Sequence, residues 1–138
     1  TALPADRAAF SPELLASMPD QVAPHQELFA ATGGVHAAAA FGTDGSVVLV
    51  REDIGRHNAV DKVVGRLVLD GGLPAAGLGL FVSGRTSFEI IQKAWAAGFA
   101  TVVAVSAPSS LAIEASRRAG ITLAGFARPG RVNLYTEA

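Results

Sequence analysis

Short apolar runs alternate with stretches of helical periodicity along most of this chain. A helix that starts at Ser11-Pro12 is expected to end before Pro19, and a second helix should cover roughly residues 24–31. Thr43-Asp44-Gly45 predicts a hairpin turn. Amphipathic stretches predict helices at about residues 55–69, 86–97 and 109–119, and apolar runs predict strands at 36–41, 47–50, 78–82, 101–106, 121–126 and 132–135.

The character of the apolar runs indicates the fold class. Residues 78–82 and 101–105 are apolar without interruption, which is typical of strands covered by helices on both faces of a sheet. The small residues 37–40 also suggest close packing on both faces. We therefore predict a single α/β domain over residues 1–138, with residues 1–10 as a lead-in. It should be a three-layer sandwich whose mixed sheet has an antiparallel first pair and otherwise parallel strands.

Composition narrows the function classes. Half of the 138 residues are hydrophobic and 17% are charged, which excludes disorder for most of the chain. A net charge of -1 provides no basic surface for nucleic acid or an anionic membrane, and no apolar run reaches the ~20 residues of a membrane span. The absence of cysteine excludes disulfides, thiolate catalysis and Cys-ligated zinc within these residues, and is compatible with a cytoplasmic protein. A chain that begins at Thr1 without Met is interpreted as a piece of a longer one.

The most polar join between a strand and a helix lies at residues 51–62. Two arginines, Arg51 and Arg56, stand beside the predicted start of a helix. A helix N-terminus offers unpaired N–H groups and a partial positive charge, so this segment could bind a phosphate or another anion. The alternative is an ordinary helix start with a solvated first turn, capped by Asp53 or Asn58.

Three loops of this kind should meet. Ligands gather at the carboxyl ends of the parallel strands in such a sheet, and residues 53–58, 83–87 and 106–110 are all predicted to lie there. Residues 83–87 offer hydroxyls and Arg85, but have no Walker A spacing. The competing interpretation is a capped helix, with capping-box spacing between Thr86 and Glu89.

Three further hypotheses, on catalysis, metal binding and the core, have weaker support in the sequence. A hydrolase triad of Ser83, His57 and Asp61 lacks a Gly-x-Ser-x-Gly motif. Asp61 lies four residues after His57 and could orient its ring. His36 and His57 could bind a metal only if a carboxylate joined them. Trp95 falls on an apolar helical stripe and is expected in the core.

Several segments together resemble one protein family. Residues 32–38, 51–62, 83–89 and 105–112, and the stretch from Gly125-Phe126 to Tyr135-Thr136, are similar to the signature of the formate dehydrogenase accessory sulfurtransferases, the FdhD/NarQ family. The resemblance covers about residue 10 to the end. It implies a cytidine-deaminase-like fold, a cytoplasmic location and a homodimer. Unlike the deaminases, the chain has no Pro-Cys-x-x-Cys zinc ligands, so no zinc is expected.

The resemblance also implies a function. Members carry sulfur from a cysteine desulfurase to the molybdenum or tungsten bis(molybdopterin guanine dinucleotide) cofactor of formate dehydrogenase, and bind GDP or GMP as mimics of that cofactor. Residues 126–131 match the short cofactor-binding segment of the family. The candidate cofactor-binding residues are Gly33, Gly34, His36, Asp53, Gly55, Arg56, His57, Asn58, Ser83, Gly84, Arg85, Ser87, Ser106, Ser109, Phe126, Ala127, Arg128, Pro129, Gly130 and Arg131.

One departure from the family leaves the activity of this chain open. Members hold the sulfur on a cysteine in a loop that precedes the matching region, and this sequence has no cysteine. The expectation is a C-terminal domain that begins after that loop and cannot itself form a persulfide. Three function classes remain: the cofactor-binding domain of a sulfurtransferase, a guanine-nucleotide-binding module without catalysis, and a metal-free serine hydrolase.

Overall fold

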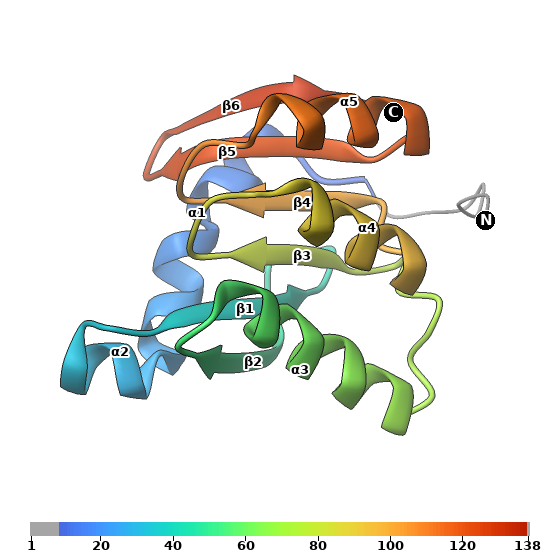
Figure 1. The fold of residues 1–138 in the computed structure, drawn as a ribbon. Coiled ribbons are helices and arrows are strands. Elements are labelled where there is room, and N and C mark those ends of the chain that lie inside the picture. Colours follow the sequence, from blue (N-terminus) through green and yellow to red (C-terminus); the bar gives the residue numbers. More distant parts are fainter. Residues whose placement is uncertain (1–8, 138) are drawn as a thin grey trace.

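The computed structural model describes residues 9–137, so most of the predicted lead-in lies outside the described residues. Within residues 9–137, six strands and six helical segments alternate much as the sequence pattern predicts (Figure 1). The helices are α1 (Pro12–Val22), the 3-10 turn η1 (Ala23–His25), α2 (Glu27–Thr32), α3 (Arg56–Leu69), α4 (Phe88–Ala97) and α5 (Ser110–Ala119). The strands are β1 (His36–Phe41), β2 (Val47–Asp53), β3 (Gly79–Val82), β4 (Thr101–Ala104), β5 (Thr122–Arg128) and β6 (Arg131–Thr136).

The strands form one mixed sheet in the order β2-β1-β3-β4-β5-β6. The β1–β2 hairpin is antiparallel and β3, β4 and β5 are parallel, as predicted. The expectation that all remaining pairs are parallel is wrong at two places, because β1 also pairs antiparallel with β3, and β6 with β5. The first difference arises because β1 lies between β2 and β3, and the second because a tight turn connects β5 directly to β6.

Helices cover both faces of the sheet, so the three-layer prediction is confirmed. Helix α1 lies on one face, while α3, α4 and α5 lie on the other (Figure 1). Each face has its own buried cluster. On the α1 side, Leu15, Met18 and Val22 pack with Phe41 and Phe81. The opposite cluster is built from the apolar stripes of α3, α4 and α5 on small and branched strand residues. Burial on both faces explains the uninterrupted apolar runs of the central strands.

Helix α1 does not end before Pro19, as the sequence suggested, but continues to Val22 with Pro19 inside it. A proline inside a helix costs about 3 kcal/mol because it removes a hydrogen bond and crowds the preceding turn. Met18 and Val22 on either side of it are completely buried against the sheet. Burying two such side chains contributes about 1.5–3 kcal/mol each, which offsets the cost.

Helix α4 also begins one residue later than the capping-box spacing implied. Its N-cap is Ser87, whose Oγ accepts a hydrogen bond from the Ile90 amide at 3.3 Å. Thr86 is instead buried, with 1% of its surface exposed. The prediction that Trp95 lies in the core is wrong as well, because its side chain is 39% exposed.

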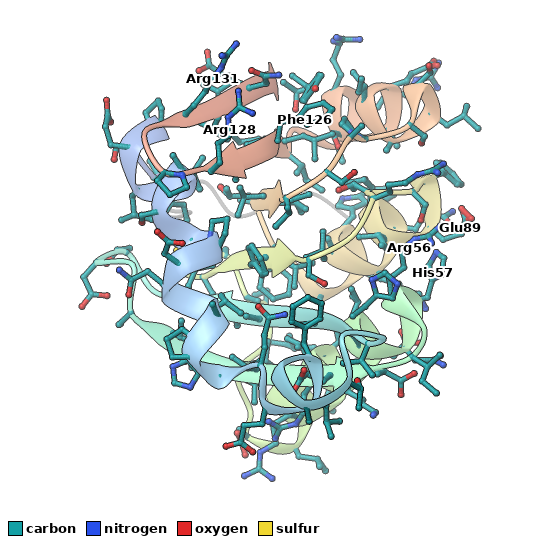
Figure 2. The ribbon with its side chains drawn as sticks, turned by 90° about the vertical axis from the view of Figure 1, so that its left-hand side faces the viewer. Arg56, His57, Glu89, Phe126, Arg128 and Arg131 are labelled. Carbon is teal, nitrogen blue, oxygen red and sulfur yellow. The ribbon has the colours of Figure 1, made fainter. Side chains whose placement is uncertain are left out.

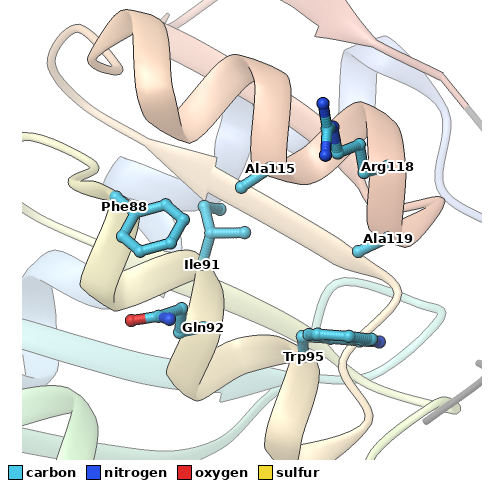
Figure 3. Close-up of a pocket in the computed structure, with 7 residues that line it drawn as sticks. All are labelled: Phe88, Ile91, Gln92, Trp95, Ala115, Arg118 and Ala119. Carbon is cyan, nitrogen blue, oxygen red and sulfur yellow. The ribbon is translucent and has the colours of Figure 1, made fainter.

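Trp95 lies on the outer side of the helix layer, in a shallow apolar groove between α4 and α5 (Figure 3). Phe88, the first residue of α4, lies in the same groove, and Ala115 and Ala119 of α5 form the opposite wall. None of the residues that line this groove belongs to the predicted site. Within the described part of the chain, no helix has both the length and the hydropathy needed to cross a membrane.

Candidate functional site

The three polar loops converge at one edge of the sheet, as predicted. β2, β3 and β4 all run toward this edge, and α3, α4 and α5 begin there (Figure 1). The loops after β3 and β4 lie side by side: the Thr86 amide donates to the Ala107 carbonyl at 3.3 Å, and the Ser109 amide donates to the Thr86 carbonyl at 2.9 Å. Parallel strands with helical crossovers bring such loops together.

One cavity at this edge has a volume of about 320 Å³ and lies where the three helices begin; we call it the anion cavity. It is lined by Arg56, Arg85, Thr86, Ser87, Ala107, Pro108 and Ser109. Four of these residues were predicted as site residues: Arg56, Arg85, Ser87 and Ser109. Helix N-termini and two guanidinium groups make the cavity suitable for an anion.

Two polar atoms around the anion cavity are buried and have no hydrogen-bond partner among residues 9–137. They are Nε of the half-buried Arg56 and Oγ1 of the buried Thr86. A buried polar group left unpaired costs free energy, about 1–3 kcal/mol for a neutral one and more for a charged one. An anion that accepts hydrogen bonds in the cavity would remove that cost. Thr86 lies in one of the predicted loops, but its spacing to Glu89 predicted a helix cap. Its burial depends on the packing of neighbouring loops, which the local sequence does not show.

A second cavity of about 390 Å³ lies beside α2 and the start of β1; we call it the ring cavity. Because β1 is antiparallel to β3, its first residues reach the edge where β3 ends. Four predicted site residues therefore line this cavity, namely Gly33, Gly34, His36 and Ser83. Its apolar lining, from Phe29, Val35, Phe81 and Val105, was not predicted, nor were Pro19 and Gln26.

Gly84 lies close to one side chain from each cavity. A Cβ added at this residue would lie 3.0 Å from Nδ1 of His36, on the ring-cavity side, and 3.6 Å from Cδ of Arg56, on the anion-cavity side. Glycine is therefore the residue that leaves space between these two side chains.

Asp53 and Gly55 form the turn that leads into α3, next to the anion cavity. The N-cap of α3 is Gly55 rather than Asp53 or Asn58, and no described side chain caps this helix directly. Oδ1 of Asp53 accepts from the Gly55 amide at 2.9 Å and from Nδ2 of Asn58 at 3.4 Å. Nζ of Lys62 lies 2.8 Å from the other Asp53 oxygen. These contacts fix the turn that places Arg56 at the cavity.

Lys62, together with the Gly55 amide, lowers the pKa of Asp53 from its ordinary 3.8 to about 2. A lowered folded-state pKa means that the ionised carboxylate stabilises the fold above about pH 4, and that this contribution is lost as the pH falls toward about 2. Asp53→Asn should thus unfold at a lower temperature than the wild type near neutral pH. The difference in Tm should shrink between about pH 4 and 2 when followed by circular dichroism. Asp20→Asn controls for loss of a surface carboxylate, and a difference in Tm that does not change with pH would contradict the assignment.

The hypotheses about His57 and Asp61 need correction. Nε2 of His57 lies 2.9 Å from Oγ of Ser87, whereas Asp61 accepts a hydrogen bond from Nζ of Lys93 at 2.7 Å. Asp61 thus pairs with α4 and does not orient His57. Oγ of Ser83 accepts from the Ala37 amide at 2.8 Å. The hydrolase triad is therefore wrong, since each of its members has a different partner.

The predicted segment at residues 126–131 lies on the same edge but lines neither cavity. Phe126 has a positive φ of 53° in a bulge of β5, and its amide donates to the Ser106 carbonyl at 3.2 Å. This contact holds the bulge beside the loop after β4. Arg128 and Arg131 face solvent at the Pro129–Gly130 turn, on the side of the edge opposite Arg56 (Figure 2). Among the described residues, no group of three His, Asp or Glu side chains could hold a metal ion together.

Comparison with known proteins identifies the family. The model of the FdhD/NarQ family matches residues 1–138. The chain belongs to this family. It is 54% identical over 124 residues to the sulfur carrier protein FdhD of Streptomyces avermitilis, covering 90% of this chain and 44% of that protein. It is 52% identical over 133 residues to the sulfur carrier protein FdhD of Mycobacterium tuberculosis, covering 96% of this chain and 48% of the relative. The chain thus spans about half the length of these relatives.

Solved structures agree with the family and the fold class. A formate dehydrogenase accessory protein from Desulfotalea psychrophila superposes with a TM-score of 0.88 at 26% identity, over 99% of this chain and 57% of that one. A guanine deaminase from Nitrosomonas europaea superposes with a TM-score of 0.57 at 14% identity, over 89% of this chain and 81% of its own. The second likeness concerns the fold alone, and it confirms the expected similarity to deaminases.

Proposed function

We propose that this FdhD/NarQ family chain is the cofactor-binding part of a sulfur carrier. In this proposal, sulfur passes from a cysteine desulfurase to the molybdenum or tungsten bis(molybdopterin guanine dinucleotide) cofactor of formate dehydrogenase, in the cytoplasm. Support comes from the names of the relatives and of the Desulfotalea psychrophila structure. The sequence contains no cysteine, so the proposal places the sulfur-carrying cysteine outside these residues, in a homodimeric full-length protein.

The cofactor is the substrate here, and its guanine nucleotide arms are the part that this chain would hold. The observation that supports this role is the pair of buried, unpartnered donors, Arg56 Nε and Thr86 Oγ1, around a cavity formed by helix starts in the described part of the chain. A phosphate supplies oxygen acceptors for both and interacts favourably with the helix dipoles. The donor set therefore fits a phosphorylated ligand. Arg128 and Arg131 would meet a more distant phosphate of the same ligand.

Calorimetric titration of GDP, GMP and ADP into the protein tests the binding role. GDP should bind, and it should bind more tightly than ADP if the guanine base is read as well as the phosphates. A nucleotide-binding module without a role in sulfur transfer would give the same titrations. The two functions separate in a sulfur-transfer assay with the full-length protein, the desulfurase and formate dehydrogenase that lacks cofactor sulfur.

Thr86→Val probes the anion cavity without changing the shape of the side chain. Removing an unpartnered buried hydroxyl should leave the stability unchanged or raise it slightly, whereas GDP should bind about tenfold more weakly because one hydrogen bond to a charged group is lost. Ser116→Ala is the matched control, since Ser116 Oγ is also buried without a partner among the described residues but lies outside the cavity. If Thr86→Val binds GDP as tightly as the control does, the hydroxyl plays no part in binding.

A further inference from the structure

Helix α2 is held to the rest of the protein in an unusual way. It is six residues long, and each of its residues with a described side chain is exposed, including Leu28 at 53% and Phe29 at 48%. So short a helix has little stability of its own, and most helices in proteins depend on burying an apolar face. Since these side chains form no buried face, another interaction must hold α2 in place.

That interaction comes from Glu52 in β2. Its Oε1 accepts a hydrogen bond from the Leu28 amide at 3.0 Å, and its Oε2 accepts from the Phe29 amide at 2.9 Å. The N-cap residue Gln26 makes no side-chain capping bond, so Glu52 provides the cap from a distant part of the chain. A carboxylate at a helix N-terminus makes charge-assisted hydrogen bonds and interacts favourably with the helix dipole.

Glu52 is itself held firmly. Its backbone is paired with Ala37 of β1 on the edge strand of the sheet, and its carbonyl accepts a hydrogen bond from Nζ of Lys62 at 2.9 Å. The same Lys62 ammonium lies 2.8 Å from Asp53. Two consecutive acids at the end of β2 thus have separate tasks. Asp53 fixes the turn into α3 beside the anion cavity, and Glu52 fixes α2 beside the ring cavity.

The position of α2 decides the shape of the ring cavity. Phe29 of α2 lines this cavity, and so do Gly33 and Gly34, which follow the helix directly. The buried Phe81 and Val105 also line it. Aromatic and aliphatic walls with a few polar groups are suited to a flat heterocyclic ring. Gly84 leaves room for such a ring to be joined to a phosphate in the anion cavity.

We propose that Glu52 is a positioning residue, which clamps α2 against the end of β2 and so shapes the ring cavity as the subsite for the base of a nucleotide. This inference rests on the proposed function, because it assigns the two parts of one ligand to the two cavities. Glu52 does not touch the ligand. It acts through the two α2 amides and the placement of Phe29.

The test compares GDP with inorganic pyrophosphate, which has no ring. In Glu52→Ala, GDP should bind about tenfold more weakly because its subsite loses one wall, while pyrophosphate should bind as it does to the wild type. Hydrogen exchange at the Leu28 and Phe29 amides should become faster in the same variant. Glu52→Gln retains one acceptor oxygen and should recover part of the GDP affinity. Glu114→Ala removes an exposed carboxylate from α5, lines neither cavity, and is the control that should leave both affinities unchanged.

The possible outcomes separate this proposal from the proposed function. If the wild type binds neither GDP nor pyrophosphate, the proposed function fails. If the wild type binds GDP and Glu52→Ala binds it equally well, the clamp is wrong while the proposed function stands. Equal losses for GDP and pyrophosphate in Glu52→Ala would also overturn the clamp, since they would indicate general damage to the site. Slow exchange at both amides in Glu52→Ala would show that α2 is held by something else.

Discussion

Arg56→Ala should bind GDP about ten- to a hundredfold more weakly than the wild type, which corresponds to losing about 1.5–3 kcal/mol of charge-assisted hydrogen bonding. Arg56 is the first residue of α3, it lines the anion cavity, and its Nε is buried without a partner in the described part of the chain. The salt dependence of GDP binding should change little, because a pair enclosed in a cavity is poorly screened. The stability should fall by no more than about 0.5 kcal/mol, since no internal bond of Nε is broken.

Arg66→Ala is the matched control for Arg56→Ala. Arg66 lies in the same helix, is exposed, and pairs with Asp70 at 3.2 Å. Its replacement removes the same charge but should leave GDP affinity unchanged. Isothermal titration of both variants at two salt concentrations measures these effects. If Arg56→Ala binds GDP as tightly as the wild type, residues 51–62 are an ordinary helix start with no role in binding.

Gly79→Ala should have the largest effect on stability of any single methyl group added to the sheet. Gly79 of β3 is paired with Phe41 of β1, and an added Cβ would overlap the Phe41 ring. That ring is completely buried, so it cannot move away without disturbing the α1 side of the core. Overpacking of this kind costs about 1–3 kcal/mol, and a contact this short places the variant at the upper end or beyond.

The measurement is urea unfolding, in which a lower midpoint with an unchanged slope reports lost stability. Gly65→Ala is the control for the same substitution. Gly65 is exposed within α3, where an added Cβ meets nothing within 4 Å, so alanine should stabilise the protein by about 0.5–1 kcal/mol. Equal midpoints for Gly79→Ala and the wild type would show that the Phe41 ring has room to move.

Local patterns in the sequence are sufficient to predict most elements and half of the site. Apolar runs locate each strand to within a few residues, because strand and helix periodicity depends on neighbouring residues alone. The same patterns place three helix starts at one edge of the sheet. Parallel strands end at the same edge, so the helix that follows each of them begins there. The residue patterns therefore predict that the loops at 53–58, 83–87 and 106–110 meet, and Arg56, Arg85, Ser87 and Ser109 from these loops line the anion cavity.

Only the tertiary structure shows how the other predicted residues come together and which of their atoms lack partners. The direction of β1 brings His36 to the ends of β3 and β4, and this depends on β1 lying between β2 and β3. Thr86 is a candidate only because its hydroxyl is buried without a partner among the described residues. Asp61 pairs with Lys93, 32 residues away, rather than with the nearby His57.

The sequence by itself determined the family, the fold class and the identity of the polar loops, because these are recorded in residue types and their local spacing. The structure decided which polar atoms are satisfied and which remain free for a ligand. Glu52 shows the difference most clearly: in the sequence it is one acid in a polar segment, and in the fold it caps a helix 23 residues earlier in the chain. Hydrogen-bond partners distant in sequence form only when the sheet brings them together, so no local pattern can specify them.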